Sequence, residues 1–218
     1  KFRVIVEHRS PHAPTFEPVR RQLAVIAPSA SAILVPENAV GVASISSAAV
    51  AVEVFAHGAN PIICLNARDR NALGVRRDLL TATALGIEEF LLVGGDAALG
   101  GTRSGESVPS LLAAFRSFTD EFGNNGATAH VTSRLGAVAP WKHEADGLFL
   151  QASFSIDELH RWRESTTFSG PIYAGVLVPP SAARALRWTR DLPGVTVPER
   201  WIAALERDEV LELVEVRL

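Results

Sequence analysis

The sequence has little sulfur: of its 218 residues, one is cysteine and none is methionine. A lone Cys64 excludes an internal disulfide framework and a multi-cysteine metal site, and its position inside an apolar run predicts an inert core thiol. His130 and His143 have no partner at metal-ligand spacing, so the sequence predicts no metal site. Because methionine is missing even at position 1, we expect the full polypeptide to contain further residues.

Long apolar runs and an excess of basic residues are also missing. No run reaches the length of a membrane span, residues 1–10 do not resemble a signal peptide, and the formal net charge is −3, whereas a nucleic-acid partner normally requires a basic face. These absences favour a soluble cytoplasmic protein without nucleic-acid or membrane partners, and they leave a homo-oligomer open. Hydrophobic residues make up 47% and charged residues 21%, which suffices for a sizeable core.

The most informative stretch runs from Ile62 to Asp96. Its two apolar, strand-like runs, 62–65 and 90–93, each end abruptly in polar residues. The segment 69–85 between them has helical periodicity, because its apolar residues recur at helical spacing: Leu73, Leu79, Leu80 and Ala84. Such a β-α-β unit favours parallel strands.

The same alternation continues along the chain. Strands are predicted at 2–7, 32–35, 62–65, 90–93, 127–133, 147–150, 171–178 and 213–218. Helices are predicted at 16–26, 42–57, 69–85, 110–122, 156–163, 181–189 and 198–207. This pattern predicts an α/β protein, a single-domain (β/α)8 TIM-type barrel over residues 1–218. An open, doubly wound sheet is the alternative.

Polar residues at the carboxyl ends of barrel strands share one mouth, and here they are Glu7, Asn66, Arg68, Asp69, Asp96 and Gln151. Such a set can orient a polar heterocycle and pass it a proton. Glu7 follows an apolar strand, so burial should raise its pKa and make it a usable general acid.

Each of these residues also has a simpler interpretation. Asp69 opens the predicted helix and is typical of a cap, while Arg68 can pair with a neighbouring carboxylate. Gly94 and Gly95 fit a phosphate cradle, but two glycines are not specific for one. The four tryptophans fit packing positions better than stacking platforms.

Four segments, in register along most of the chain, resemble the methylenetetrahydrofolate reductase family. They are VEHRSP (6–11), LNARDRN with DLLTATALGIEEFLLVGGD (65–96), FLQASFSIDEL (149–159) and the segment 171–206. The resemblance implies a flavin-bearing (β/α)8 barrel of one-carbon metabolism. Enzymes of that family reduce 5,10-methylenetetrahydrofolate to 5-methyltetrahydrofolate with NADH or NADPH, so the resemblance implies this reaction.

The resemblance also implies roles for individual residues. Glu7 would be the acid that helps to open the methylene bridge of the folate into an iminium ion. Asp96 would contact the pterin and stabilise developing charge, and Gln151 would hydrogen-bond the pterin. Asn66, Arg68, Gly94, Gly95 and Asp96 fall where the family binds FAD.

The chain departs from the family at its flavin site. Pro36 replaces a threonine, Gly94 replaces an arginine, Asn66 replaces a threonine, and the loop expected near 136–142 is almost absent. Three functions therefore stay open: reduction through bound FAD, direct hydride transfer from NAD(P)H to the folate, and a non-catalytic folate- or nucleotide-binding barrel. A metabolic barrel of unrelated chemistry ranks last, because it would make four ordered motif matches a coincidence.

Overall fold

The computed structural model describes residues 3–96, 105–191 and 195–207. The chain divides into two compact units. The first comprises residues 1–132 with 139–148, and the second comprises 133–138 with 149–218. The prediction that residues 1–218 form one domain stays a prediction. Among the residues described, no helix is long and apolar enough to cross a membrane.

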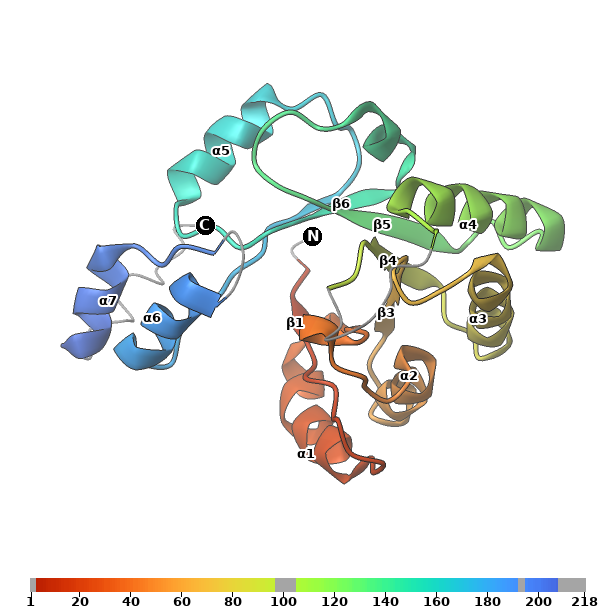
Figure 1. Ribbon diagram of the computed structural model, residues 1–218, viewed down its shortest axis with the longest axis horizontal. Helices are drawn as coiled ribbons and strands as arrows, with labels where there is room; N and C mark the ends of the chain where they lie inside the picture. Colours follow the sequence, from red (N-terminus) through yellow and green to blue (C-terminus); the bar gives the residue numbers. More distant parts are fainter. Residues whose placement is uncertain (1–2, 97–104, 192–194, 208–218) are drawn as a thin grey trace. The chain divides into compact units, whose positions relative to one another are not determined.

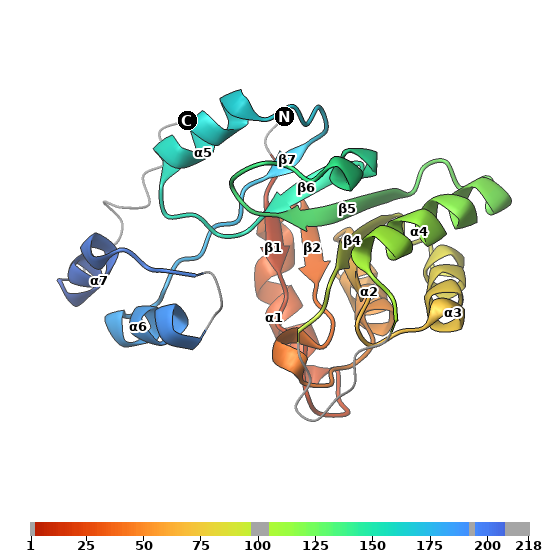
Figure 2. The same cartoon turned by 45° about the horizontal axis from the view of Figure 1, so that its top comes forward.

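The first unit alternates strands and helices from its start (Figures 1 and 2). Its strands are β1 (Ile5–Glu7), β2 (Ala32–Val35), β3 (Pro61–Asn66), β4 (Glu89–Val93), β5 (Thr128–Ser133) and the start of β6 (Gly147–Leu150). Its α-helices are α1 (Glu17–Ile26), α2 (Ser47–Ala56), α3 (Ala72–Ala84) and α4 (Val108–Phe122). Short 3-10 turns are η1 (Ala27–Ser29), η2 (Ala39–Gly41) and η3 (Pro140–Glu144).

The strands of the first unit pair in parallel and in chain order. β1 to β5 are neighbours in sequence and in the sheet, with registers such as Glu7 beside Leu34 and Leu34 beside Ile62. A doubly wound sheet reverses its strand order at a switch point, and no reversal occurs from β1 to β5. The unit therefore has the singly wound β/α order of an α/β barrel.

Helices cover one face of this sheet. Figure 1 shows α1 to α4 following one another around the strands, and neighbouring helices contact each other in that order. All six residues of β3 are buried, as is typical of an inner strand of a parallel sheet. The rings of Phe90 on β4 and Phe115 on α4 pack with centroids 5.3 Å apart, so aromatic packing joins the helix layer to the sheet.

The structure corrects three predicted helix starts. The helix expected at 42–57 begins at Ser47. The helix expected at 110–122 begins at Val108, because Pro109 fits the first helical turn, where its missing N–H is not needed. The helix expected from Asp69 begins at Ala72, since the side chain of Asn71 caps it by accepting a hydrogen bond from the Gly74 N–H.

The predicted apolar face of α3 is also partly wrong. Leu73 is 77% exposed and Leu80 is 44% exposed. The residues that face the core are Val75, Leu79 and Ala82. The later helix start and the packing of α3 against the sheet determine which side is buried, and neither is visible in the spacing of leucines alone.

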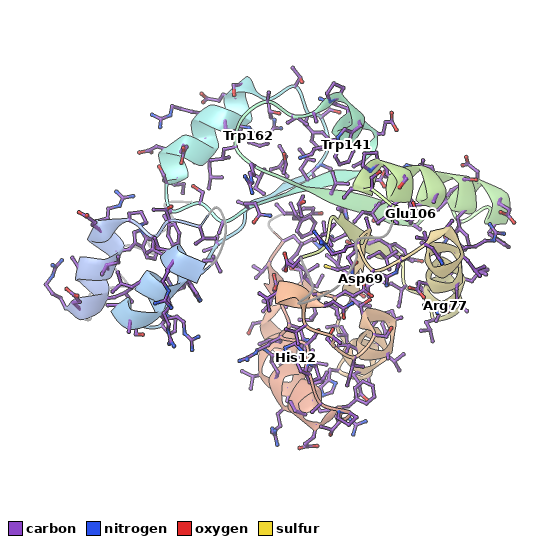
Figure 3. The ribbon with its side chains drawn as sticks, viewed as in Figure 1. His12, Asp69, Arg77, Glu106, Trp141 and Trp162 are labelled. Atoms are coloured by element: carbon purple, nitrogen blue, oxygen red, sulfur yellow. The ribbon has the colours of Figure 1, made fainter. Side chains whose placement is uncertain are left out.

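The second unit contains the end of β6, α5 (Ile156–Ser165), β7 (Ile172–Tyr173), α6 (Ala182–Asp191) and α7 (Glu199–Glu206). The strand expected at 171–178 is thus only two residues long, and the strand expected at 213–218 lies outside the described residues. Trp162 on α5 (Figure 3) is buried and donates its indole N–H to the Gly136 carbonyl at 2.7 Å. Trp201 is buried against Phe154, so both tryptophans pack as predicted.

Truncating Phe115 tests the aromatic contact between α4 and β4. Phe115→Ala should lower the free energy of unfolding by about 3–5 kcal/mol, because it leaves a cavity beneath α4. Urea denaturation followed by circular dichroism measures this loss. Phe122 on the same helix is 51% exposed, so Phe122→Ala is the matched control and should cost about 1 kcal/mol or less. Equal losses would contradict the assigned packing.

Candidate active-site loops

The loops after β2 and β3 are joined by a buried ionic cluster of Glu37, Asn66, Arg70 and Asp78, which we call the Glu37–Arg70 cluster. Both guanidinium nitrogens Nη1 and Nη2 of Arg70 donate to the Glu37 carboxylate, and its Nε donates to Asp78 Oδ2 at 2.8 Å. The Asn66 backbone N–H and its side-chain amide donate to Glu37 Oε2 at 3.1 and 3.0 Å. One carboxylate therefore binds two segments together.

Burial makes the Glu37–Arg70 cluster important for stability. The side chains of Arg70 and Glu37 are only 10% and 7% exposed. Burial alone lowers the pKa of the Arg70 guanidinium, but hydrogen bonds and charge from Glu37 and Asp78 outweigh burial and raise it. Arg70 is therefore a fixed cation that holds two carboxylates.

A second set of contacts fixes the η2 turn. The Asn38 side-chain amide donates to Asp69 Oδ2 at 2.9 Å, and the Val40 N–H donates to Asp96 Oδ2 at 2.7 Å. Asn38 and Val40 have positive φ angles of 47° and 54°, which are strained for a β-branched residue such as Val40. Asp69, labelled in Figure 3, thus positions a loop and does not cap α3.

The Gly94–Gly95 segment packs against the chain itself. Gly95 has a φ of +78°, and an added Cβ would lie 3.1 Å from the side chains of Asn66 and Arg68. Arg68 Nε donates to the Gly95 carbonyl at 3.3 Å. Arg68 was expected to pair with a neighbouring carboxylate. Among the described residues, Arg70 forms such ion pairs instead, with Glu37 and Asp78.

Glu7 is the last residue of β1. In the sheet register it lies beside Leu34 of β2, which lies beside Ile62 of β3. Its side chain reaches solvent, but the surrounding protein desolvates the carboxylate and raises its pKa. The direction of this pKa shift is the predicted one, although the Glu7 side chain is exposed. Burial, with the nearby charges of Glu7 and Glu37, also raises the pKa of the Cys64 thiol, which keeps this core cysteine protonated and unreactive, as predicted.

Sequence reasoning did not find two titratable groups, one buried and one partly buried. His8, next to Glu7, is fully buried, and neither ring nitrogen has a hydrogen-bond partner among the described residues. Burial lowers the pKa of this imidazole. Glu89 is the second group: burial raises its pKa, but hydrogen bonds from His130 and Arg3 outweigh burial and lower the pKa to about 2.

Gln151 belongs to the second unit, where it lines a cavity of about 420 Å³. The other lining residues that carry charge are Arg134, Glu158 and Arg200. Apolar walls come from Leu135, Phe154 and Pro198. The size falls within the range of small-molecule sites, so the predicted substrate residue lies in a cavity of suitable volume.

The first unit brings together Asn66, Arg68, Asp69, Gly95 and Asp96 through their loops, while Gln151 lies in the second unit. Sequence reasoning missed Glu37 and Arg70, although Glu37 lies two residues after β2 and Arg70 lies four residues after β3. Their positions after strands were the available signal. No group of three or more potential metal ligands occurs among the residues that the structure describes.

Two of the residues predicted to hold a flavin, Asn66 and Gly95, are occupied by contacts within the chain. Asn66 donates both amide and backbone N–H groups to Glu37, and its side-chain oxygen accepts the Asp69 N–H. The neighbourhood of Gly95 is filled by Asn66 and Arg68. The polar groups of Asn66 and the space beside Gly95 are therefore already used within the chain.

No protein-family model matches this chain, and no curated protein shows significant sequence similarity to it. Solved structures do match. A glycoside hydrolase family 17 β-1,3-glucanosyltransferase from Rhizomucor miehei has a TM-score of 0.56 at 11% identity, covering 82% of this chain and 72% of that chain. Tryptophan synthase from Pyrococcus furiosus has a TM-score of 0.52 at 15% identity, covering 97% and 94%.

A 2,3-dimethylmalate lyase of the PEP mutase/isocitrate lyase superfamily has a TM-score of 0.50 at 11% identity, covering 96% of this chain and 91% of that chain. At such identities the likeness shows the fold alone. It agrees with the consecutive parallel strands of the first unit, so the chain is an α/β barrel protein.

Removing Arg70 tests the Glu37–Arg70 cluster. Arg70→Ala leaves Glu37 buried without its cation, so the free energy of unfolding should fall by about 3–5 kcal/mol. The exposed pair of Arg76 and Glu121 provides the control, and Arg76→Ala should cost less than about 1 kcal/mol. Urea denaturation of both variants gives the comparison, and similar small losses would show that the cluster is dispensable.

His8 should make the fold sensitive to acid. Its folded-state pKa lies below the ordinary value of 6.5, so the neutral imidazole favours the folded chain. Stability should be complete above about pH 6.5 and fall as the pH drops below it, by up to about 1.4 kcal/mol per pH unit.

Unfolding free energies of the wild type and His8→Gln between pH 7 and 5 measure this effect, with the exposed His160→Gln as the control. Glu89 does not interfere, because its lowered pKa gives stability that is lost only below the ordinary value of 4.5. If wild type and His8→Gln show the same slope, His8 does not act as described.

Proposed function

We propose that this protein is a cytoplasmic oxidoreductase that reduces 5,10-methylenetetrahydrofolate to 5-methyltetrahydrofolate with NAD(P)H. The observation that carries the proposal is Glu7, a desolvated carboxyl group at the carboxyl end of the first barrel strand. Barrel enzymes place catalytic residues at these strand ends. The choice of reaction comes from the four ordered sequence segments, because they resemble the reductase family.

The proposed chemistry needs one proton and one hydride. Glu7 donates a proton to N10 of the folate as the bond between N10 and the bridging carbon breaks, which leaves an iminium ion at N5. The hydride of NAD(P)H then adds to that carbon and forms the N5-methyl group. A raised pKa keeps part of Glu7 protonated nearer neutrality, which suits a general acid.

We favour direct transfer from NAD(P)H over transfer through FAD. This choice rests on Asn66 and Gly95, whose polar groups and surroundings are occupied within the chain. The replacement of the family's arginine by Gly94 removes a phosphate-binding cation as well. A protein that holds folate and nicotinamide side by side can accelerate the transfer through proximity and orientation.

The family resemblance also gives Asp96 and Gln151 roles in the proposed reaction. Asp96 Oδ2 accepts the Val40 N–H, and among the described residues Oδ1 accepts no hydrogen bond, so it can face the developing cation of the iminium ion. The Gln151 carboxamide lines the cavity of the second unit and has both a donor and an acceptor for a pterin ring.

A second candidate is a non-catalytic folate- or nucleotide-binding barrel. The contact between Asp96 and Val40 favours it, because this carboxylate already has a structural task in holding a strained turn. Such a protein would bind a pterin or a nucleotide without turnover.

Replacing Glu7 separates these functions. Glu7→Gln should lower folate reduction by about 10²-fold or more, because it removes the proton. It should also raise the melting temperature at pH 7. The raised pKa means that Glu7 favours folding only when protonated, so its contribution is complete below pH 4.5 and is lost as pH rises through the folded-state pKa.

NADH oxidation in the presence of methylenetetrahydrofolate, together with thermal melting, provides both readouts. The exposed Glu88→Gln is the control and should change neither. Full turnover by a stable Glu7→Gln protein would remove Glu7 from the acid role, and absence of turnover in the wild type would favour the non-catalytic barrel.

A further inference from the structure

Val40, in the η2 turn, has a backbone conformation that its own side chain disfavours. Its φ and ψ angles are 54° and 26°, in the left-handed region, where a β-branched residue is an outlier. The isopropyl group is 63% exposed, so burial of this side chain does not offset the strain. Strained residues persist only where the surrounding structure fixes them, and they cluster at functional sites.

Contacts within the loop after β2 hold the η2 turn in this shape. The Gly41 N–H donates to the Asn38 carbonyl at 3.0 Å. The Asn38 N–H donates to Ser44 Oγ at 3.2 Å, and the Ser44 N–H donates back to Asn38 Oδ1 at 3.1 Å. These hydrogen bonds close the turn on itself. The Val40 N–H takes no part in them and is left for an acceptor outside the loop.

That acceptor is Asp96, an exposed residue that follows β4 and Gly95. The Val40 N–H donates to Asp96 Oδ2 at 2.7 Å, a length typical of a hydrogen bond to a charged acceptor. It is the one hydrogen bond that the Asp96 carboxylate accepts among the described residues. The turn has several internal contacts and the carboxylate has one external contact, so the turn orients the carboxylate.

We propose that Val40 is a positioning residue for Asp96. Its left-handed conformation directs the backbone N–H at Oδ2 and thereby fixes the direction in which Oδ1 faces. The inference rests on the proposed function, in which Asp96 faces the developing cation of the iminium ion. An exposed carboxylate that rotates freely would have to reorganise as this charge forms, whereas a carboxylate fixed beforehand does not. The strain at Val40 is the cost of that fixed orientation.

Replacing the Val40 amide by an ester tests its N–H alone. α-Hydroxyisovaleric acid at position 40 of the full chain keeps the isopropyl group and removes only the donor. The kcat of folate reduction should fall about tenfold or more, because a hydrogen bond to a charged acceptor is lost, while KM changes less than about twofold. The same replacement at Val42, whose N–H donates to the Ala39 carbonyl at 3.3 Å, is the matched control and should leave kcat nearly unchanged.

Asp96→Ala shows whether the Val40 N–H acts through the carboxylate. In this variant the ester at position 40 should have no further effect on kcat, because the two groups act as one unit. An ester that lowers kcat as much in Asp96→Ala as in the wild type would overturn the proposal. Equal losses of kcat from the esters at Val40 and Val42 would overturn it as well.

Amide hydrogen exchange, followed by NMR, separates positioning from a structural role and needs no turnover. Asp96→Ala should speed exchange of the Val40 amide about tenfold or more, and it should leave the Gly41 and Val42 amides unchanged. If Asp96 instead holds the turn, as in the second candidate function, all three amides will exchange faster together. That result would overturn the proposal.

The strain at Val40 has a test of its own. Asparagine tolerates the left-handed region better than a β-branched residue does, so Val40→Asn should raise the melting temperature by about 2–4 °C. The control is Val42→Asn, since Val42 has an extended conformation with φ of −107°, and it should not raise the melting temperature. Equal melting temperatures for the wild type and Val40→Asn would show that position 40 carries no strain.

Failure of this inference is distinct from failure of the proposed function. Turnover that is insensitive to the ester at position 40 overturns only the role of Val40. Absence of turnover in the wild type overturns the proposed reaction. In that case, exchange of the Val40 amide that depends on Asp96, with Gly41 and Val42 unaffected, supports Val40 as the residue that orients this carboxylate in a binding protein. Exchange that does not depend on Asp96 overturns both.

Discussion

The buried ion pair between Glu37 and Arg70 is the contact on which the strand-end loops of the first unit depend. Glu37 follows β2 and Arg70 follows β3. Both side chains are buried, so removing either one would leave the other as a buried, unpaired charge, which is energetically costly. Through Glu37 the cluster also holds Asn66. The Asn66 side-chain oxygen in turn accepts the Asp69 N–H, and the Asp69 carboxylate accepts a hydrogen bond from the Asn38 side chain beside the η2 turn. A chain of hydrogen bonds therefore leads from one ionic contact to the residues around Asp96.

These hydrogen bonds within the chain influence the function that we propose. Asn66 and Gly95, two of the positions where the resemblance implies FAD binding, are occupied by contacts within the chain. The Glu7 side chain reaches solvent at the end of β1, has a raised pKa, and forms no ion pair among the described residues. Groups held in an unfavourable protonation state are typical of active sites. The second unit differs, since its cavity combines Gln151 with two arginines that lack carboxylate partners. The proposed acid thus belongs to the first unit, and Gln151 lines a cavity of the second unit.

The sequence predicted strands and chain order well, because buried parallel strands are short apolar runs. The run 32–35, for example, is the observed β2. Local chemistry at helix starts was less predictable, since Asn71 and not Asp69 caps α3. The ion pair of Glu37 and Arg70 joins residues 33 positions apart, and no local pattern announces such a pair. The cavity around Gln151 was equally hidden, because its lining comes from segments near 134, 151–158 and 196–200 that only folding brings together.

The most direct test of the central claim is chemical detection of the product. The purified chain is incubated with NADH or NADPH and 5,10-methylenetetrahydrofolate, and the folates are then separated and identified, after a visible spectrum of the protein has been recorded. Our account predicts 5-methyltetrahydrofolate from a protein without a flavin band. A protein that forms no 5-methyltetrahydrofolate with either nucleotide would contradict the proposed reaction, and product from a protein with a stoichiometric flavin band would contradict direct hydride transfer.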